Sequence, residues 1–263
     1  WCVNLSSDAL KTREQTLGQL SADLRSAWSL FQWLQGFFDL RVLNSQRPGR
    51  QDSNTVLAFR EVESWIAKAR RFHKSTTPQF FDNRKRSFLD SLPDLIEAHA
   101  GSSSRNYLAM GSGFYESSSD EDTIPSVLVR IVKALKHRQL LTRFPETDVF
   151  VNPRNCQAIA MALGAISNAG WKVREALVAE FFGTKMRSLH AKFLFGASES
   201  ANSDFCNSPW VYLGSGNLTN PGFASKMSSS GGNLEAGVVF QPPRIRWRPE
   251  ERDVSELVTN YLP

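Results

Sequence analysis

The spacing of apolar residues divides the chain into a helical first part and a second part in which strands and helices alternate. Apolar side chains recur at helical spacing in two segments within residues 1–75, and a polar loop at 41–54 separates them. A further helix is expected over 80–101, which Gly101 ends and Pro93 kinks or splits. We therefore expect a helical segment to precede the more varied second part.

Beyond this helix, short apolar runs bounded by turn residues predict strands, and longer periodic runs predict helices. Their order indicates an α/β fold with a mixed, largely parallel sheet flanked by helices, followed by strands that run antiparallel to it. Two serine-rich insertions, 197–209 and 225–232, are expected to be surface loops. The expected domains are a helical linker or docking segment at 1–78 and an α/β lobe at 79–263. The expected strands are 106–116, 147–153, 171–177, 189–195, 210–219 and 233–242, and the expected helices are 127–137 and 155–170.

Composition narrows the class of protein. Hydrophobic residues make up 41% of the 263 positions, with 18 Phe and 7 Trp, which is enough for a folded core. No apolar stretch is long enough to span a membrane, so no membrane is expected as a partner. The net charge of +5 suits a polyanionic partner.

The cysteines indicate the cellular compartment, and the first residue indicates whether the chain is part of a longer protein. The 3 cysteines are widely spaced and form neither a disulfide framework nor a zinc cluster, which favours a reducing compartment. We expect the cytoplasm, or the nucleus in a eukaryote. Because the chain begins with Trp1 and not with methionine, we also expect it to be part of a larger protein or complex.

Two polar side chains interrupt the apolar segment SLHAKFLF at 188–195. In a strand, His190 and Lys192 point to the same face, because successive side chains alternate. Burying an imidazole and an ammonium is unfavourable unless an anion meets them. A sheet edge with a solvated face is the alternative interpretation, and the residues after this segment favour an anion site.

A second group of residues suited to anions occurs at the end of the next apolar segment, in the sequence GSGN. Gly214 and Gly216 allow the backbone to approach an anion closely, and Ser215 and Asn217 add neutral hydrogen-bond donors. Glu235, on the last predicted strand, is suited to hold an imidazole nitrogen and fix its tautomer.

These residues together are typical of phosphate-ester chemistry. The imidazole of His190 serves as nucleophile or proton donor, and the ammonium of Lys192 supplies fixed positive charge for the nonbridging oxygens. No acidic cluster suited to two-metal catalysis is evident, since the acidic run at 120–122 is expected to be a solvated turn. The sequence therefore predicts a site that uses no metal and no other cofactor.

The combination HAKFLF…VYLGSGNLT…NLEAGVVF resembles the HxK…GSxN signature of the phospholipase D superfamily, over about residues 80–243. That family's pattern places an Asp five residues after the Lys, and Ala197 stands there in this chain. The departure is similar to the tyrosyl-DNA phosphodiesterase branch and to some nuclease branches. The resemblance therefore favours nucleic-acid chemistry, with DNA preferred over RNA. A role in restriction or antiviral defence would fit a chain that belongs to a larger assembly.

The resemblance implies a two-step mechanism. His190 attacks phosphorus to form a phosphohistidine, a second histidine from another lobe protonates the leaving oxygen, and water then releases the phosphoryl group. Lys192 and Asn217 would hold the nonbridging oxygens, and Ser215 would assist. A phospholipase or phosphatidyltransferase is the first alternative function, and membrane-facing apolar helices would favour it.

Such a centre needs two HxK lobes, and the sequence contains one. His73, His99 and His137 do not occur in a second HxK pattern and are expected to be surface or capping residues. The second histidine is expected from a homodimer, or from a further lobe upstream or on another subunit. The remaining alternative is a catalytically inactive lobe that serves as a scaffold or binds nucleic acid.

Substrate contacts are predicted in the segment RIRWR, which comes after the last strand. Arg244 and Arg246 are candidates for contacts with backbone phosphates, and Trp247 is a candidate for stacking on a base. A solvated run of charges is the alternative interpretation.

Overall fold

A computed structural model describes residues 16–37, 54–69, 76–116, 123–152, 156–175, 189–243 and 245–247. The chain divides into two compact units, Trp1–Phe81 and Asp82–Pro263, and each is described by itself. Most of the loop predicted at 41–54, the acidic run at 120–122 and Arg244 lie outside the described residues.

The described residues of the first unit include two helices, α2 (Thr16–Gln35) and α3 (Asn54–Ala69), which agrees with the helical pattern predicted within residues 1–75. Apolar side chains of both helices are buried, among them Trp28 and Ile66. The carboxylate of Asp23 is also buried and accepts hydrogen bonds from the backbone N–H groups of Gln79 and Phe80. These bonds satisfy an acidic group that would otherwise be costly to bury.

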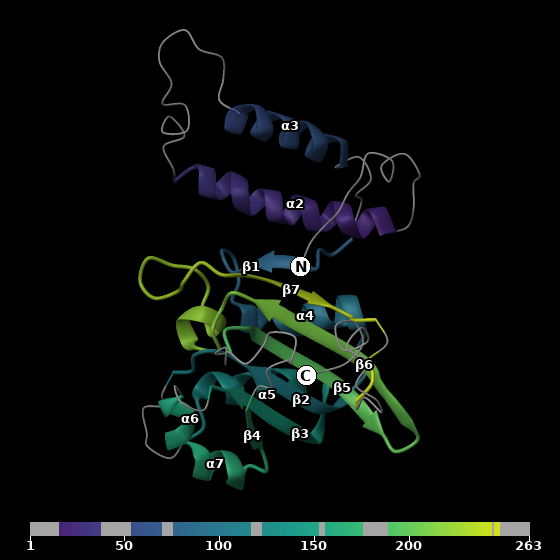
Figure 1. The fold of residues 1–263 in the computed structure, drawn as a ribbon, viewed down its shortest axis with the longest axis vertical. Helices are drawn as coiled ribbons and strands as arrows, with labels where there is room; N and C mark the ends of the chain where they lie inside the picture. The colour runs from purple at the N-terminus through teal and green to yellow at the C-terminus, as the bar shows by residue number, and fades with distance from the viewer. Residues whose placement is uncertain are drawn as a thin grey trace, which may run out of the picture. The chain divides into compact units, whose positions relative to one another are not determined.

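The second unit is built on a mixed seven-stranded sheet in the order β1-β7-β6-β5-β2-β3-β4 (Figure 1). The α/β class is confirmed. The β2–β3 and β3–β4 pairs are parallel, and the β2–β5, β5–β6 and β6–β7 pairs are antiparallel. The sheet is thus more antiparallel than predicted, because β5 and β6 are joined by a hairpin and not by a helical crossover. The strands are β1 (Phe80–Asp82), β2 (Arg105–Gly111), β3 (Leu141–Val151), β4 (Lys172–Glu175), β5 (Lys192–Ser200), β6 (Ser203–Gly214) and β7 (Ala236–Phe240).

The serine-rich segment 197–209, predicted as a loop, belongs instead to the hairpin of β5 and β6. Ser198 pairs with Asn207, and Ser200 pairs with Ser203 across the turn. The serines misled the prediction because this end of the hairpin is largely exposed, so its outer face can be polar.

The helices of this unit begin and end at identifiable residues. Helix α4 (Phe88–Ala100) starts after Ser87, whose hydroxyl accepts a hydrogen bond from the backbone of Asp90. It ends at Gly101 as predicted, with a φ of 74°, and Pro93 does not split it. The residues before Ser87 form β1 and a turn, so the helix starts later than predicted. The other helices are α5 (Ser126–His137), α6 (Gln157–Met161), α7 (Leu163–Asn168) and the π-helix η4 (Asn220–Ala224), and the helix predicted at 155–170 is thus divided in two.

Aromatic packing fixes the helices on the sheet. Phe88 of α4, Tyr212 of β6 and Phe223 of η4 meet edge to face, with ring centroids 5.4 to 5.8 Å apart. A separate buried cluster gathers around Phe195 and Cys206, and Trp247 packs against it. Of the helices described, none has the length and apolar character needed to cross a bilayer.

Candidate functional site

The ends of four neighbouring strands meet at one end of the sheet, where the candidate residues lie (Figure 1). Lys192, the first residue of β5, pairs with Gly214, the last residue of β6. Gly214 in turn pairs with Gly237 at the start of β7. On the other side of β5, Phe193 pairs with Gly111, the last residue of β2. The HxK and GSxN sequences are therefore adjacent because of strand register, although about twenty residues separate them in the chain.

His190 and Lys192 are in direct contact. Strand β5 begins at Lys192, so His190 lies just before the strand and not within it as predicted. The Lys192 Nζ atom lies 3.3 and 3.4 Å from the two ring nitrogens of His190, and it donates to the His190 carbonyl oxygen at 2.8 Å. His190 is exposed to solvent, whereas Lys192 is only 7% exposed.

The ammonium of Lys192 has no carboxylate partner among the described residues. Among the described residues, all hydrogen bonds of this ammonium go to His190, which contributes no negative charge. A buried cation without a counter-charge is unfavourable, and an anion bound beside the imidazole would compensate it.

Two residues that sequence reasoning missed position the backbone before His190. Asn152, directly after β3, donates through Nδ2 to the Leu189 carbonyl oxygen at 2.8 Å and accepts through Oδ1 from the Leu189 N–H. Gly113 lies against the same segment, since a Cβ atom there would be 2.6 Å from the Leu189 oxygen. Both residues fall near the ends of the strands predicted at 106–116 and 147–153, and an Asn or Gly near a strand end was the available signal.

Glu235 contacts Ser215 and not the imidazole that we expected it to hold. Ser215 Oγ donates to Glu235 Oε2, and Asn233 Nδ2 donates to Glu235 Oε1 at 3.3 Å. The pairing of β6 with β7 explains this arrangement, because the Ser215 N–H donates to the Ala236 carbonyl at 2.9 Å. Glu235 therefore orients the hydroxyl of the GSxN loop.

Asn83 holds the backbone at Glu235 and is a further functional candidate that the sequence pattern did not reveal. It is fully buried. Its Oδ1 accepts from the Glu235 N–H at 2.8 Å, and its own N–H donates to the Glu235 carbonyl at 3.1 Å. Its Nδ2 donates to the carbonyls of Asn233 and Ser225 at 2.8 and 3.3 Å. One side chain thus joins three segments beside the site.

Asn217 is tied to the end of β2 through Ser112. Ser112 is fully buried, and its Oγ lies 3.4 Å from Asn217 Oδ1 and accepts from the Leu218 N–H at 3.3 Å. Within the described part of the chain, the Asn217 Nδ2 group has no protein acceptor, so it is a hydrogen-bond donor available to a ligand.

The two glycines of GSGN have packing roles. A Cβ atom at Gly214 would lie 2.1 Å from the Tyr212 hydroxyl, and one at Gly216 would lie 2.3 Å from the Gly222 carbonyl oxygen. These contacts within the protein already require a glycine at both positions, and the close approach to an anion stays a prediction. Burial, with the charge of Glu235 as a second cause, raises the pKa of Tyr212 well above its usual value, so its phenol remains protonated.

Arg246 and Trp247 lie away from His190. Phe205, near the start of β6, forms a bridge with Arg246, whose guanidinium lies 5.1 Å from the Phe205 ring centroid. Phe205 is nine residues from Gly214, or roughly 30 Å along an extended strand. The ring of Trp247 packs edge to face against Tyr107 with centroids 5.1 Å apart, and base stacking by Trp247 stays a prediction.

The described residues contain no group of three or more His, Cys, Asp or Glu side chains arranged to hold a metal ion. The chemistry available at this end of the sheet is that of an imidazole, an ammonium, an amide and a hydroxyl held by a carboxylate.

The chain matches no protein-family model and no curated protein. Among solved structures it is similar to a histidine-to-alanine mutant of yeast tyrosyl-DNA phosphodiesterase, with 11% identity, a TM-score of 0.40, and coverage of 86% of this chain and 58% of that one. It is also similar to the polyphosphate kinase of Porphyromonas gingivalis, with 11% identity, a TM-score of 0.35, and coverage of 61% and 22%.

The unaltered yeast tyrosyl-DNA phosphodiesterase gives 13% identity and a TM-score of 0.29, over 65% of this chain and 34% of that one. This chain thus spans between about a fifth and three fifths of the length of these proteins. Since all three TM-scores are below 0.5, these similarities carry no argument about activity, and a function for this chain has to be inferred from the residues of its site.

Proposed function

We propose that this chain supplies one half of a phosphodiesterase centre that acts on nucleic acid, with His190 as the nucleophile. The observation that carries the proposal is a buried lysine with no acidic partner among the described residues, in contact with a solvent-exposed imidazole.

A phosphodiester fits this arrangement because its nonbridging oxygens carry the missing negative charge. At about 4 Å and an effective dielectric constant of about 20, a unit charge pair contributes about 4 kcal/mol. The free Nδ2 group of Asn217 adds a neutral donor, and Ser215, held by Glu235, adds another. Donors fixed before the substrate arrives stabilise charge that develops in the transition state.

The proposed reaction has two steps. A ring nitrogen of His190 attacks phosphorus, a P–N bond forms, and the P–O bond to the leaving group breaks while a second histidine donates a proton to the leaving oxygen. Water then attacks phosphorus, the second histidine takes its proton, and the P–N bond breaks to release the phosphoryl group and free His190.

We propose that the second histidine is His190 of a second copy of the chain. His99 and His137 lie near the C-terminal ends of α4 and α5, and neither is a neighbour of the strand ends at His190. His137 comes shortly before β3, whose first residue pairs with the start of β2, roughly 20 Å of strand from the end of β2 beside the site. A two-fold axis through the site would bring two identical lobes together.

Nucleic acid is the proposed substrate because the chain carries a net charge of +5, which suits a polyanion. DNA as the preferred substrate and a role in restriction or antiviral defence stay predictions.

The test compares turnover of a fluorescent single-stranded oligonucleotide by the wild type, His190→Ala and His137→Ala. His137 is a matched control, since it is exposed and distant from the site. We expect His190→Ala to lose roughly 10⁴-fold or more of the rate and His137→Ala to retain it. Turnover should persist in excess EDTA, and rapid acid quenching should trap a phosphohistidine. A wild-type chain that binds the oligonucleotide without cleaving it would support the inactive-lobe alternative and contradict the proposal.

A further inference from the structure

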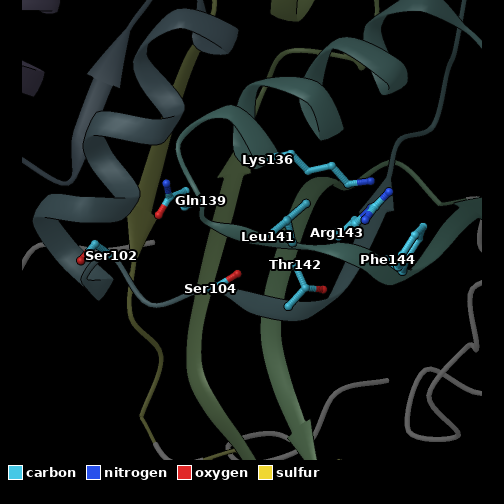
Figure 2. Close-up of a pocket in the computed structure, with 8 residues that line it drawn as sticks. All are labelled: Ser102, Ser104, Lys136, Gln139, Leu141, Thr142, Arg143 and Phe144. Carbon is cyan, nitrogen blue, oxygen red and sulfur yellow. The ribbon is translucent and has the colours of Figure 1, made fainter.

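A pocket of about 780 Å³ lies at the other end of the sheet from His190, where β2 and β3 begin (Figure 2). Arg105 and Leu141, the first residues of these strands, are paired there. Strand β2 runs from Arg105 at this pocket to Gly111 beside the candidate site, so roughly 20 Å of strand separates the two. Polar, basic and aromatic side chains line the pocket, among them those of Ser102, Ser104, Lys136, Thr142, Arg143 and Phe144.

Two cations and no carboxylate line this pocket. Figure 2 shows the side chains of Lys136 and Arg143 extending toward the same side of it. In the ranges that the structure describes, neither has an ion-pair partner. Lys136 is also not required to cap α5, because the backbone N–H groups of Gln139 and Leu140 donate to the carbonyls at the end of that helix. Two like charges brought to one side of a pocket favour an anionic ligand.

Three acidic residues, on α4 and β3, are paired with other basic residues. Arg138 donates to Asp94 at 2.9 Å and to Glu97 at 2.6 and 3.1 Å. Glu146 forms an ion pair with Lys172. The negative charge of the surrounding surface is therefore compensated before a ligand arrives, and it does not cancel the charge of the pocket.

One wall of the pocket is held rigid by Arg105. This residue is fully buried, and its guanidinium donates to the carbonyl oxygens of Ala100, Gly101, Ser103 and Ser208. Ser102 and Ser104 lie within the loop that these bonds fix. The guanidinium also places a further positive charge behind the wall, with only neutral carbonyls to meet it.

A hydroxyl and an aromatic ring complete the lining. The Thr142 Oγ1 atom is buried and has no hydrogen-bond partner within the described part of the chain. Phe144 is 81% exposed, and the Arg143 guanidinium lies 5.1 Å from its ring centroid. So exposed a phenylalanine has one face available for another planar group, and base–aromatic stacking is how proteins bind unpaired nucleotides.

From these observations we propose that the pocket binds a nucleotide of single-stranded nucleic acid. Lys136 and Arg143 hold the phosphate, Thr142 donates a hydrogen bond, and a base stacks on Phe144. The proposal does not depend on the reaction at His190, because the two sites lie at opposite ends of the sheet.

The test measures fluorescence anisotropy of a short fluorescein-labelled oligothymidylate with the full chain in a His190→Ala background, so that no cleavage interferes. We expect Phe144→Ala to weaken binding on the order of 5- to 100-fold and Phe144→Trp to retain it, because stacking needs a planar ring. In Lys136→Gln/Arg143→Gln, the slope of log K against log salt should become shallower by about 1.4, as two phosphate contacts are lost.

Lys133→Gln is the matched control, because Lys133 is an exposed lysine of the same helix that does not line the pocket. If the pocket variants bind the oligonucleotide as the control does, the proposal is overturned. It is also overturned if Phe144→Ala has no effect while inorganic phosphate competes fully, since the pocket would then be a simple anion site. If the wild type does not cleave the oligonucleotide but substitutions in the pocket still weaken its binding, only the reaction proposed at His190 is contradicted.

Discussion

Replacing Lys192 by methionine should strongly reduce turnover while leaving the protein as stable as before or more stable. Lys192 is 7% exposed, and its ammonium donates to one carbonyl, that of His190, at 2.8 Å. Loss of a hydrogen bond from a charged donor costs about 1.5–3 kcal/mol. Removing a buried, unpaired charge recovers a desolvation penalty of several kcal/mol, and methionine fills a similar volume. We therefore expect the free energy of unfolding to rise by about 0–3 kcal/mol.

Two assays on the same preparations test this expectation. Thermal unfolding monitored by tryptophan fluorescence should give a Tm that is unchanged or raised by up to about 10 °C, given about 2–4 °C per kcal/mol for a unit of this size. Oligonucleotide turnover should fall on the order of 100-fold or more, because a fixed charge opposite the phosphoryl oxygens is lost. Lys172→Met, which removes an exposed lysine paired with Glu146, should alter neither result by much.

The opposite result would refute the reasoning. If Lys192→Met lowers the free energy of unfolding by more than about 1 kcal/mol, the ammonium stabilises the fold, and its burial says nothing of a ligand. Turnover at the wild-type rate would remove Lys192 from the reaction.

Three further predictions concern the shared site, its support and its surroundings. Mixing wild-type and His190→Ala chains should depress oligonucleotide turnover below simple dilution if the site is built from two copies, and a strictly additive response would place the second histidine elsewhere. Asn83→Ala leaves several buried backbone groups beside Glu235 without hydrogen-bond partners. Urea denaturation should therefore show that the free energy of unfolding falls by about 2–4 kcal/mol. A change below about 0.5 kcal/mol would show that water replaces the hydrogen bonds of Asn83. Burial raises the pKa of Cys206 to about 12, so its thiol is neutral at pH 8. The thiol should therefore react with a disulfide reagent only after unfolding, which peptide mapping by mass spectrometry can show. Rapid labelling of Cys206 in the native protein would contradict this prediction.

The sequence predicted contacts that arise from local periodicity. Alternation in a strand put His190 and Lys192 on one side, and the two groups are in contact, although the strand begins only at Lys192. Gly101 ends its helix as expected, because a positive φ is easily adopted by glycine.

Contacts that depend on register between strands could not be predicted in the same way. The pairing of Ser215 with Glu235 results from the backbone bonds between β6 and β7. Arg246 and Trp247 were expected near the site because they come after the last strand. However, β7 starts beside Gly214 and runs away from it, and Arg246 pairs with Phe205 at the far end of β6, so these two described residues lie away from His190.

Strand pairing also explains why a long serine-rich segment between HxK and GSxN leaves the site intact. Lys192 and Gly214 are paired at the open end of the β5–β6 hairpin, which is the end that lies at the site. Residues 197–209 form the other half of the hairpin, which includes its turn. Residues added to both strands of an antiparallel hairpin lengthen it at the turn and do not alter the pairing already made at its other end. The spacing between the two motifs can therefore vary in pairs of residues at no cost to the site. A single-residue insertion confined to one strand requires a bulge, and the register shifts between Gly196 and Ser200 show that the far half of the hairpin already contains such irregularities while Lys192 stays paired with Gly214. What brings the HxK and GSxN sequences together is thus the pairing of Lys192 with Gly214, and not the number of residues between them in the chain.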